Sequence, residues 1–185
     1  MSPDKSGHTE SAGIDAQTKR ELLARLLRER ASAANEPFPL SLGQEDLWFL
    51  RELAPASPAY HIPFCVRTKS AVNCERLESS LRTLLERYPA LRCTFVQDAE
   101  GVKQQIGAMP AQCLERVDAS EWSEDELSRR VNESYRRPFD LSRGPVLQMA
   151  VFVRPGKGDV LLLSVHHIVF DAWSLGVFLE ELALL

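Results

Sequence analysis

Residues 164–174 read Ser-Val-His-His-Ile-Val-Phe-Asp-Ala-Trp-Ser, and they are the most informative stretch of the chain. A mainly apolar run, residues 160–165, leads directly into two adjacent histidines, and a second apolar segment follows from Trp173. The first run has the length of a buried strand, and the second is long enough for a helix. A histidine can exchange a proton near neutral pH, and Asp171 lies four positions after the second histidine. The stretch therefore predicts a strand, a turn and a helix that display titratable groups at the mouth of a buried strand.

Outward from this stretch, apolar periodicity and turn residues predict further strands and helices. Strands are expected over residues 62–68, 91–97, 102–106, 146–153 and 159–165. Helices are expected over residues 44–51, 73–88, from 123 onward, and from 173 towards 185. The strands form two hairpins, with turns at residues 98–101 and 155–158, and Trp48 and Trp173 are expected in the core. The pattern predicts an α/β chain of the α+β type, with helices packed on a largely antiparallel or mixed sheet.

The two ends of the chain differ from its body. Residues 1–15 are rich in small and charged residues and predict a disordered tail, and residues 16–36 predict an amphipathic helix (Thr18–Ala31) followed by a linker. This helix either packs on its own domain or docks onto an upstream protein. Residues 37–185 form the predicted lobe, and its last residues, 182–185, are all apolar. We therefore expect the chain to be a fragment or a truncated form of a longer protein.

Composition narrows the class of protein. The 185 residues carry a formal net charge of −4 without a basic run, which argues against nucleic acid and anionic membranes as partners. No apolar segment reaches the roughly 20 residues that a membrane span needs, and the N-terminus lacks the apolar core of a secretion signal. The four cysteines have no metal-binding spacing and are expected to be reduced, as in a cytoplasmic protein. We expect no metal and no directly bound cofactor.

Several segments, in one order along the chain, resemble the condensation domain of nonribosomal peptide synthetases, a member of the chloramphenicol-acetyltransferase-like superfamily. Residues 166–172 resemble the HHxxxDG motif, with Ala172 in place of glycine. The other matching segments are Ser41–Leu50 (SLGQEDLWFL), Tyr60–Pro63 (YHIP), Arg87–Phe95 (RYPALRCTF) and Arg137–Pro145 (RPFDLSRGP). The resemblance covers about residues 37–185 and implies the N-terminal lobe only, with the C-terminal lobe absent. Of the subtypes, it favours a peptide-bond-forming member over cyclisation and epimerisation domains.

The resemblance also implies roles for individual residues. His167 matches the catalytic position, where it acts as general base or positions the attacking amine and stabilises the tetrahedral intermediate. His166 is expected to be structural, because neighbours on a strand point to opposite faces. Asp171 is expected to form a buried ion pair with Arg92, with Arg87 as the second choice of partner; alternatively it caps the following helix. Ser174 lines the tunnel or serves the start of that helix.

The implied reaction is amide formation between two thioesters carried by donor and acceptor carrier proteins. The substrates would hang from the phosphopantetheine arms of those partners, and the helix Thr18–Ala31 could meet an upstream synthetase. Two alternatives remain open. One is a stand-alone acyltransferase of the same superfamily, and the other is a non-catalytic truncated lobe that only binds carrier proteins.

Overall fold

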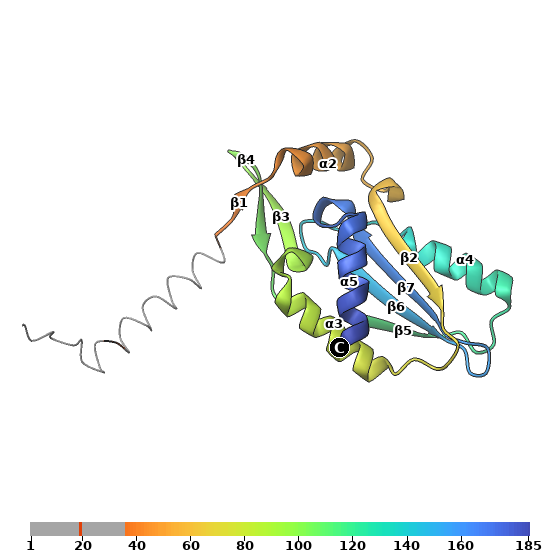
Figure 1. The fold of residues 1–185 in the computed structure, drawn as a ribbon. Helices are drawn as coiled ribbons and strands as arrows, with labels where there is room; N and C mark the ends of the chain where they lie inside the picture. Colours follow the sequence, from red (N-terminus) through yellow and green to blue (C-terminus); the bar gives the residue numbers. More distant parts are fainter. Residues whose placement is uncertain (1–18, 20–35) are drawn as a thin grey trace, which may run out of the picture. The chain divides into compact units, whose positions relative to one another are not determined.

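The structure, a computed structural model, describes Lys19 and residues 36–185. The predicted tail and nearly all of the predicted helix Thr18–Ala31 lie outside the described residues. Residues 37–185 form one compact unit of strands and helices, drawn in Figure 1.

The larger sheet has four strands in the order β2-β7-β6-β5, and it carries the histidines at one end. Its strands are β2 (His61–Arg67), β5 (Leu114–Asp118), β6 (Leu147–Val153) and β7 (Val160–His166). β6 and β7 form the predicted hairpin, and β2 pairs antiparallel with β7. β5 was not predicted from the sequence, and it runs parallel to β6, so the sheet is mixed.

The smaller sheet has three strands in the order β1-β4-β3 and is separate from the larger one. Its strands are β1 (Phe38–Pro39), β3 (Cys93–Asp98) and β4 (Gly101–Ile106). The predicted hairpin between β3 and β4 is confirmed, with Asp98 opposite Gly101 at its turn. The sequence suggested a single sheet, and the structure divides its strands between two.

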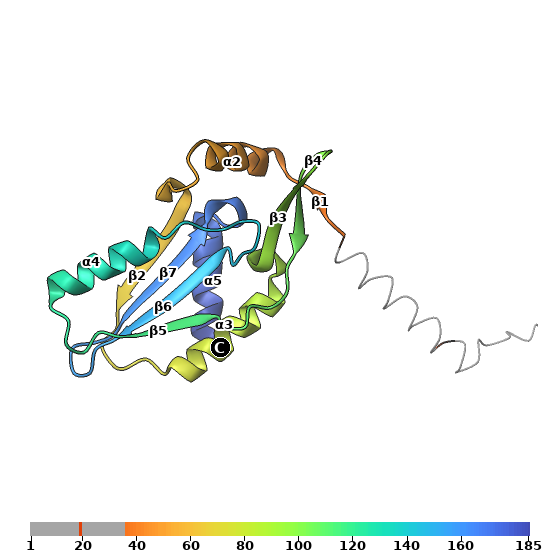
Figure 2. The same ribbon diagram turned by 180° about the vertical axis from the view of Figure 1, so that it is seen from behind.

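Helices cover both faces of the larger sheet, as Figures 1 and 2 show from opposite sides. α3 (Cys74–Arg87) and α5 (Ala172–Leu184) lie on one face, and α4 (Glu124–Tyr135) lies on the other. Side chains of a strand alternate between faces, so β6 and β7 feed two separate cores. The core towards α3 and α5 includes Leu84, Leu147, Met149, Val151, Leu163, Val165 and Phe178. The core towards α4 includes Leu127, Ala150, Phe152, Val160 and Leu162.

A third core lies under α2 (Leu42–Leu53) and the small sheet. It contains Leu40, Cys93, Phe95, Phe139, Leu141, Val146 and Ile168. Trp48 on α2 was expected in the core, and the structure packs it against this core only partly buried, together with Leu47; no residue of α2 is fully buried. Trp173 was also expected in the core, and its side chain is 82% exposed. It stands in the first turn of α5 and belongs to none of the three cores.

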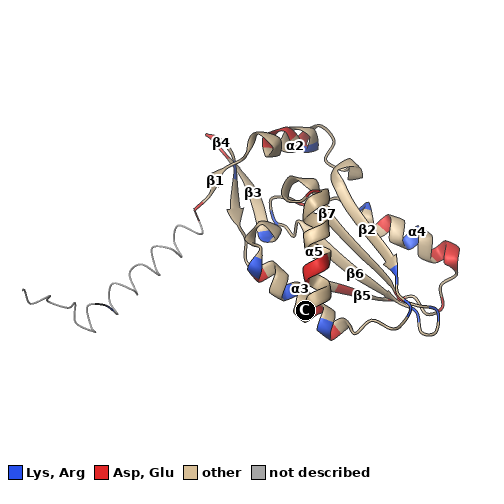
Figure 3. Cartoon of the chain, in the orientation of Figure 1, with Lys and Arg blue, Asp and Glu red and all other residues tan. Residues whose placement is uncertain are grey.

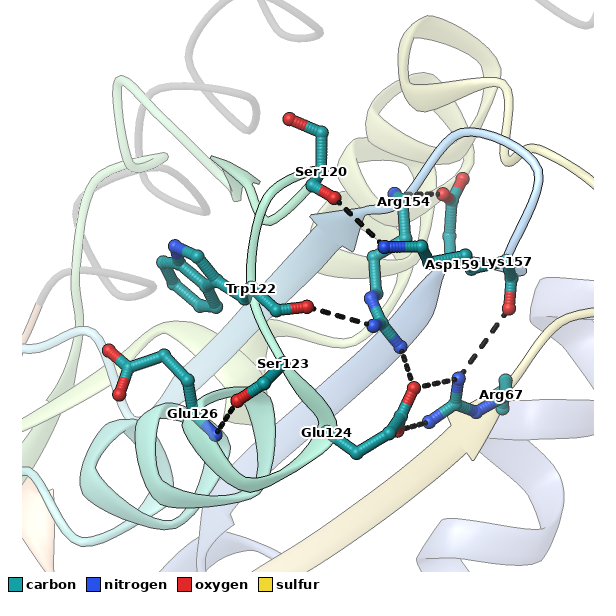
Figure 4. Close-up of polar contacts among 9 residues, drawn as sticks. All are labelled: Arg67, Ser120, Trp122, Ser123, Glu124, Glu126, Arg154, Lys157 and Asp159. Atoms are coloured by element: carbon teal, nitrogen blue, oxygen red, sulfur yellow. Dashed lines mark hydrogen bonds and ion pairs between the residues drawn. The ribbon is translucent and has the colours of Figure 1, made fainter.

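A polar network fixes the end of the larger sheet that lies away from the histidines (Figure 4). Arg154, only 2% exposed, donates from Nη1 to Glu124 Oε1 (2.6 Å) and from Nη2 to the Trp122 carbonyl (3.2 Å). Arg67 Nη2 at the end of β2 reaches Glu124 Oε2 at 2.6 Å. Glu124, the first residue of α4, thus joins that helix to β2 and β6. We name this set of three side chains the Glu124 clamp.

The buried carboxylate of Asp159 closes the turn beside the clamp. Its Oδ1 accepts from the Arg154 backbone N–H (2.7 Å) and its Oδ2 from that of Val72 (2.8 Å). Gly158 in this turn has φ +78°, and a Cβ there would meet the Thr68 carbonyl oxygen at 2.3 Å. Only glycine allows the hairpin to pass so close to the chain that follows β2.

Candidate active site

The site is built on the turn between β7 and α5. β7 ends at His166, a single 3₁₀ turn follows over His167–Val169, and α5 begins at Ala172. Ile168, in the middle of the turn, is buried in the core under α2 and anchors the loop. The two histidines therefore face different surroundings: His166 is buried and His167 is exposed.

His166 lies in an aromatic and apolar environment, 4% exposed. Its ring centroid is 6.0 Å from that of His61 on β2 and 5.9 Å from that of Phe139, which it meets edge-on. Its Nδ1 accepts the backbone N–H of Ile168 (3.1 Å), so the neutral ring carries its proton on Nε2. Burial lowers the pKa of His166 to about 4, with smaller electrostatic contributions from its neighbours His61, Arg51 and His167. His166 thus stays neutral at physiological pH and completes the turn.

His167 has the opposite arrangement. Its Nδ1 lies 2.6 Å from the Phe170 carbonyl oxygen, and a carbonyl can only accept, so Nδ1 must donate. In the neutral ring, Nε2 therefore has a free lone pair. The adjacent histidines hold opposite tautomers because their Nδ1 atoms face a donor in one case and an acceptor in the other. Of the two, only His167 has a nitrogen ready to take a proton from a bound molecule.

An open groove of about 300 Å³ lies in front of His167. It is lined by residues of α2, of the turn and of α5, among them Ser41, Gly43, Gln44, Asp171 and Ser174. Ser174, predicted to line a tunnel or to serve the helix start, borders this groove. Its hydroxyl also donates to Asp171 Oδ1 (2.7 Å), so it takes part in the start of α5 as well.

The predicted ion pair between Asp171 and Arg92 is not formed, and this part of the prediction is wrong. Asp171 is exposed and caps α5: its Oδ1 accepts the Ser174 backbone N–H at 2.7 Å, which is the first cause of its lowered pKa. Arg92 instead donates to two backbone carbonyls, those of Leu85 (2.8 Å) and Gly107 (2.9 Å). The second choice, Arg87, pairs with Glu181 on α5 at 2.6 Å. The first turn of a helix has backbone N–H groups without partners, and a carboxylate at the N-cap accepts hydrogen bonds from them. Asp171 is therefore stabilised without an arginine.

The chain matches a known family of domains. A family model described as Condensation domain matches residues 34–185. The chain belongs to the condensation-domain family. Its curated relatives are peptide synthases. A linear gramicidin synthase of Brevibacillus parabrevis is 38% identical over 190 residues, and a dimodular nonribosomal peptide synthase of Bacillus subtilis is 38% identical over 147 residues.

Solved condensation domains have the same fold. The starter condensation domain of rhizomide synthetase superposes with a TM-score of 0.72 at 23% identity. The first condensation domain of the calcium-dependent antibiotic synthetase, in complex with a substrate analogue, superposes with a TM-score of 0.70 at 25% identity. Each match covers 80% of this chain and 36% of the solved chain. The two peptide synthases named above are matched over 95% and 80% of this chain, and the chain spans 2% and 6% of their lengths.

Two residues of the site were not singled out from the sequence. His61 shares the buried space beside His166, and its Nδ1 donates to the carbonyl of Tyr135 at the end of α4 (2.8 Å). Gln44 of α2 reaches the carbonyl of Ile168 inside the turn (3.2 Å). Both lie in segments that the family resemblance covers, but the pairing of β2 with β7 and the packing of α2 on the turn are needed to see their roles. Among the described residues, no group of His, Cys, Asp and Glu side chains could hold a metal ion, and no helix is long and apolar enough to cross a membrane.

Proposed function

We propose that the chain supplies the histidine-bearing part of a domain that forms amide bonds in nonribosomal peptide synthesis. The observation that carries the proposal is His167: exposed in a groove, with Nδ1 held by the Phe170 carbonyl and Nε2 free. Membership of the condensation-domain family and the peptide synthases among its relatives support this chemistry.

In the proposed reaction, the amine of an acceptor aminoacyl thioester attacks the carbonyl carbon of a donor thioester. The new C–N bond forms, and the C–S bond of the donor breaks. His167 Nε2 takes the proton that the amine loses, and the departing thiolate is then protonated to a thiol. The bond to Phe170 keeps the ring in the tautomer that this step needs and fixes its orientation.

The proposed partners are donor and acceptor carrier proteins, which would deliver their thioesters on phosphopantetheine arms. The groove is open, which suits substrates that arrive on long arms and leave again after transfer. Ser174 and Asp171 border the groove beside His167, and we assign them to shaping it. Docking of an upstream synthetase on residues 18–31 stays a prediction.

The test is His167→Ala in a protein that joins this chain to the rest of the condensation fold. Single-turnover dipeptide formation from loaded carrier proteins should fall by about 10²–10⁴-fold, the usual contribution of a general acid–base group. The exposed Glu121→Ala, outside the groove, is the matched control and should keep the wild-type rate. A His167→Ala protein that folds normally and forms dipeptide at the control rate would contradict the proposal.

A further inference from the structure

The side-chain amide of Gln44 forms four hydrogen bonds, the full number that a glutamine amide can make. Its Oε1 accepts from the Ser41 backbone N–H (3.0 Å) and from Gln104 Nε2 (2.9 Å). Its Nε2 donates to Gln104 Oε1 (3.0 Å) and to the carbonyl of Ile168 (3.2 Å). The Ser41 N–H can only donate and the Ile168 carbonyl can only accept, so the partners fix which end of the amide is oxygen. Gln44 is therefore held in one orientation from both sides.

The bond to Ile168 enters the turn that carries His167. A 3₁₀ turn of three residues leaves most of its own carbonyls without a partner inside the turn. The His167 carbonyl accepts the Phe170 N–H (3.3 Å), and the Ile168 carbonyl has its partner in Gln44, which lies on another element 124 positions earlier. Gln44 also lines the groove that holds the His167 ring. The turn is therefore held by two hydrogen bonds: one from Gln44 on α2 to the Ile168 carbonyl, and one within the turn from His167 Nδ1 to the Phe170 carbonyl.

A simpler explanation for a glutamine here is the start of α2. Ser41 and Gln44 form a capping box, in which the third residue of the helix accepts the N–H of the cap residue. A glutamate would serve that role equally well, since only an acceptor is needed. It would not serve the other two partners, because the Ile168 carbonyl and Gln104 Oε1 both require a donor. The cap alone therefore does not account for an amide at this position.

We infer that Gln44 is a positioning residue for the condensation reaction, which holds the Ile168 carbonyl and so keeps the His167 ring in the orientation and tautomer that leave Nε2 free. Gln104 bonds the same amide and is itself tied to the Pro39 carbonyl by Nε2 (3.2 Å), but the Ser41 N–H and the Ile168 carbonyl are enough to fix the orientation of Gln44. The inference rests on the proposed function for its kinetic consequence, but its structural consequence can be measured without any substrate.

Three variants of the full chain separate the alternatives. Gln44→Glu keeps the capping box and removes the donor to Ile168, and Gln44→Met removes both. Gln104→Met is the matched control, since it removes the amide pair but leaves the bond from Gln44 to Ile168. Long-range ¹H–¹⁵N spectra of the imidazole rings identify the tautomer of His167 in each protein. Wild type and Gln104→Met should show one tautomer, protonated at Nδ1, and Gln44→Glu and Gln44→Met should show a mixture. Gln44→Glu keeps the capping box and should therefore unfold at a temperature close to that of Gln104→Met. A single Nδ1-protonated tautomer in Gln44→Glu would overturn the inference, as would a mixture of equal size in Gln104→Met.

The kinetic arm uses the protein that joins this chain to the rest of the fold. Gln44→Glu should slow single-turnover amide formation by about 10–100-fold with little change in KM, because misplacement of a catalytic group by about 1 Å costs up to about 100-fold. Gln104→Met should remain within about threefold of wild type. If the wild-type protein forms no amide, the proposed function fails while the tautomer measurement still decides the role of Gln44. A normal rate in Gln44→Glu beside an inactive His167→Ala would overturn the positioning role alone.

Discussion

At the scale of single residues, the site depends on two neighbouring histidines that differ in burial and in the hydrogen bond of their Nδ1 atoms. His166 is buried at the end of β7 and keeps a pKa of about 4, while an unfolded chain would titrate it near 6.5. Between these two values the unfolded state binds a proton that the folded state does not. The folded state therefore loses stability as the pH falls from 6.5 towards 4, and gains nothing from this group above 6.5.

The first prediction follows from that difference. His166→Asn keeps an acceptor for the Ile168 N–H and removes the titration. Wild type should lose about 3 kcal/mol more unfolding free energy than this variant between pH 6.5 and pH 4, since one pKa unit corresponds to about 1.4 kcal/mol. Urea titrations at a series of pH values measure it. Parallel pH curves for the two proteins would show that His166 is not the group responsible.

A second prediction concerns Asp171 and Arg92, which bind separate partners. Arg92→Met leaves the Leu85 and Gly107 carbonyls without donors and should cost roughly 1–3 kcal/mol. Asp171→Ala removes the cap of α5 and should lower the melting temperature slightly, whereas Asp171→Asn should keep most of the cap. Residues without shared partners give additive effects, so the double variant should equal the sum of the singles. If the double variant differed strongly from the sum of the single variants in thermal unfolding, Asp171 and Arg92 would interact after all.

At the scale of elements, the Glu124 clamp holds the start of α4 against the ends of β2 and β6. Arg67 first, and Arg154 second, lower the pKa of Glu124 from 4.5 to about 2. The carboxylate therefore stabilises the fold fully above pH 4.5, and this contribution disappears as the pH falls through about 2. The pH range in which Glu124 affects stability, from 4.5 to about 2, lies almost entirely below the range for His166, from 6.5 to about 4. The two contributions to the unfolding free energy can therefore be measured separately.

The clamp yields a third prediction, because its two partners differ in burial. Arg154 is almost fully buried, and Glu124 is largely exposed. Glu124→Ala should destabilise the protein much more than Glu121→Ala, a nearby exposed carboxylate, because it leaves a buried guanidinium with only the Trp122 carbonyl. Arg154→Met combined with Glu124→Ala should recover part of the loss. Thermal melts at pH 7 and pH 2 compare these proteins, and equal melting temperatures for the Glu124 and Glu121 variants at pH 7 would refute the clamp.

The elements also show where reasoning from sequence succeeds. The hairpins, α3 and α4 have strong apolar periodicity and capping residues such as Asn73 and Ser123, and the structure has them close to their predicted bounds. β5 was missed because only Leu114 and Val117 of its five residues are apolar, so it shows no alternation. Trp173 was misplaced because apolar character marks a helix without saying which side is covered.

The same limit applies to the site. The histidine motif located the turn, and it could not identify what Asp171, Gln44 and His61 contact. For Gln44 and His61, the contacts come from segments about a hundred residues away along the chain, which only the pairing and packing of the elements bring together. The family resemblance implied an arginine partner for Asp171, and its partner is instead the backbone N–H of Ser174 at the start of α5.

At the scale of the molecule, the groove before His167 has walls from α2, the turn and α5 only, within the described residues. α5 is nearly free of charge, apart from one acidic turn, as Figure 3 shows, and it exposes Trp173, Val177 and Leu184. Solved condensation domains extend well beyond the region that this chain matches, since the match covers 36% of their length. Grouped exposed apolar side chains are typical of an interaction surface.

The final prediction is that residues 1–185 alone do not catalyse condensation. Positioning two tethered reactants is worth up to about 7–11 kcal/mol of the barrier, and a groove open to water on one side should lose most of it. Loaded donor and acceptor carrier proteins, offered to this chain and to a protein with the rest of the fold, compare the two rates. Equal rates would mean that the described groove is already a complete site.

The antiparallel register of β2 against β7 has a consequence for the order of folding. β6 and β7 meet across a short turn, while β2 must close a loop of about a hundred residues to set His61 opposite His166. Contacts so distant along the chain form slowly, so the hairpin should assemble early and β2 should join it late. Substitutions in the turn should then slow folding, and substitutions in β2 should mainly hasten unfolding. The burial that lowers the pKa of His166 should then be complete only after β2 has joined the sheet.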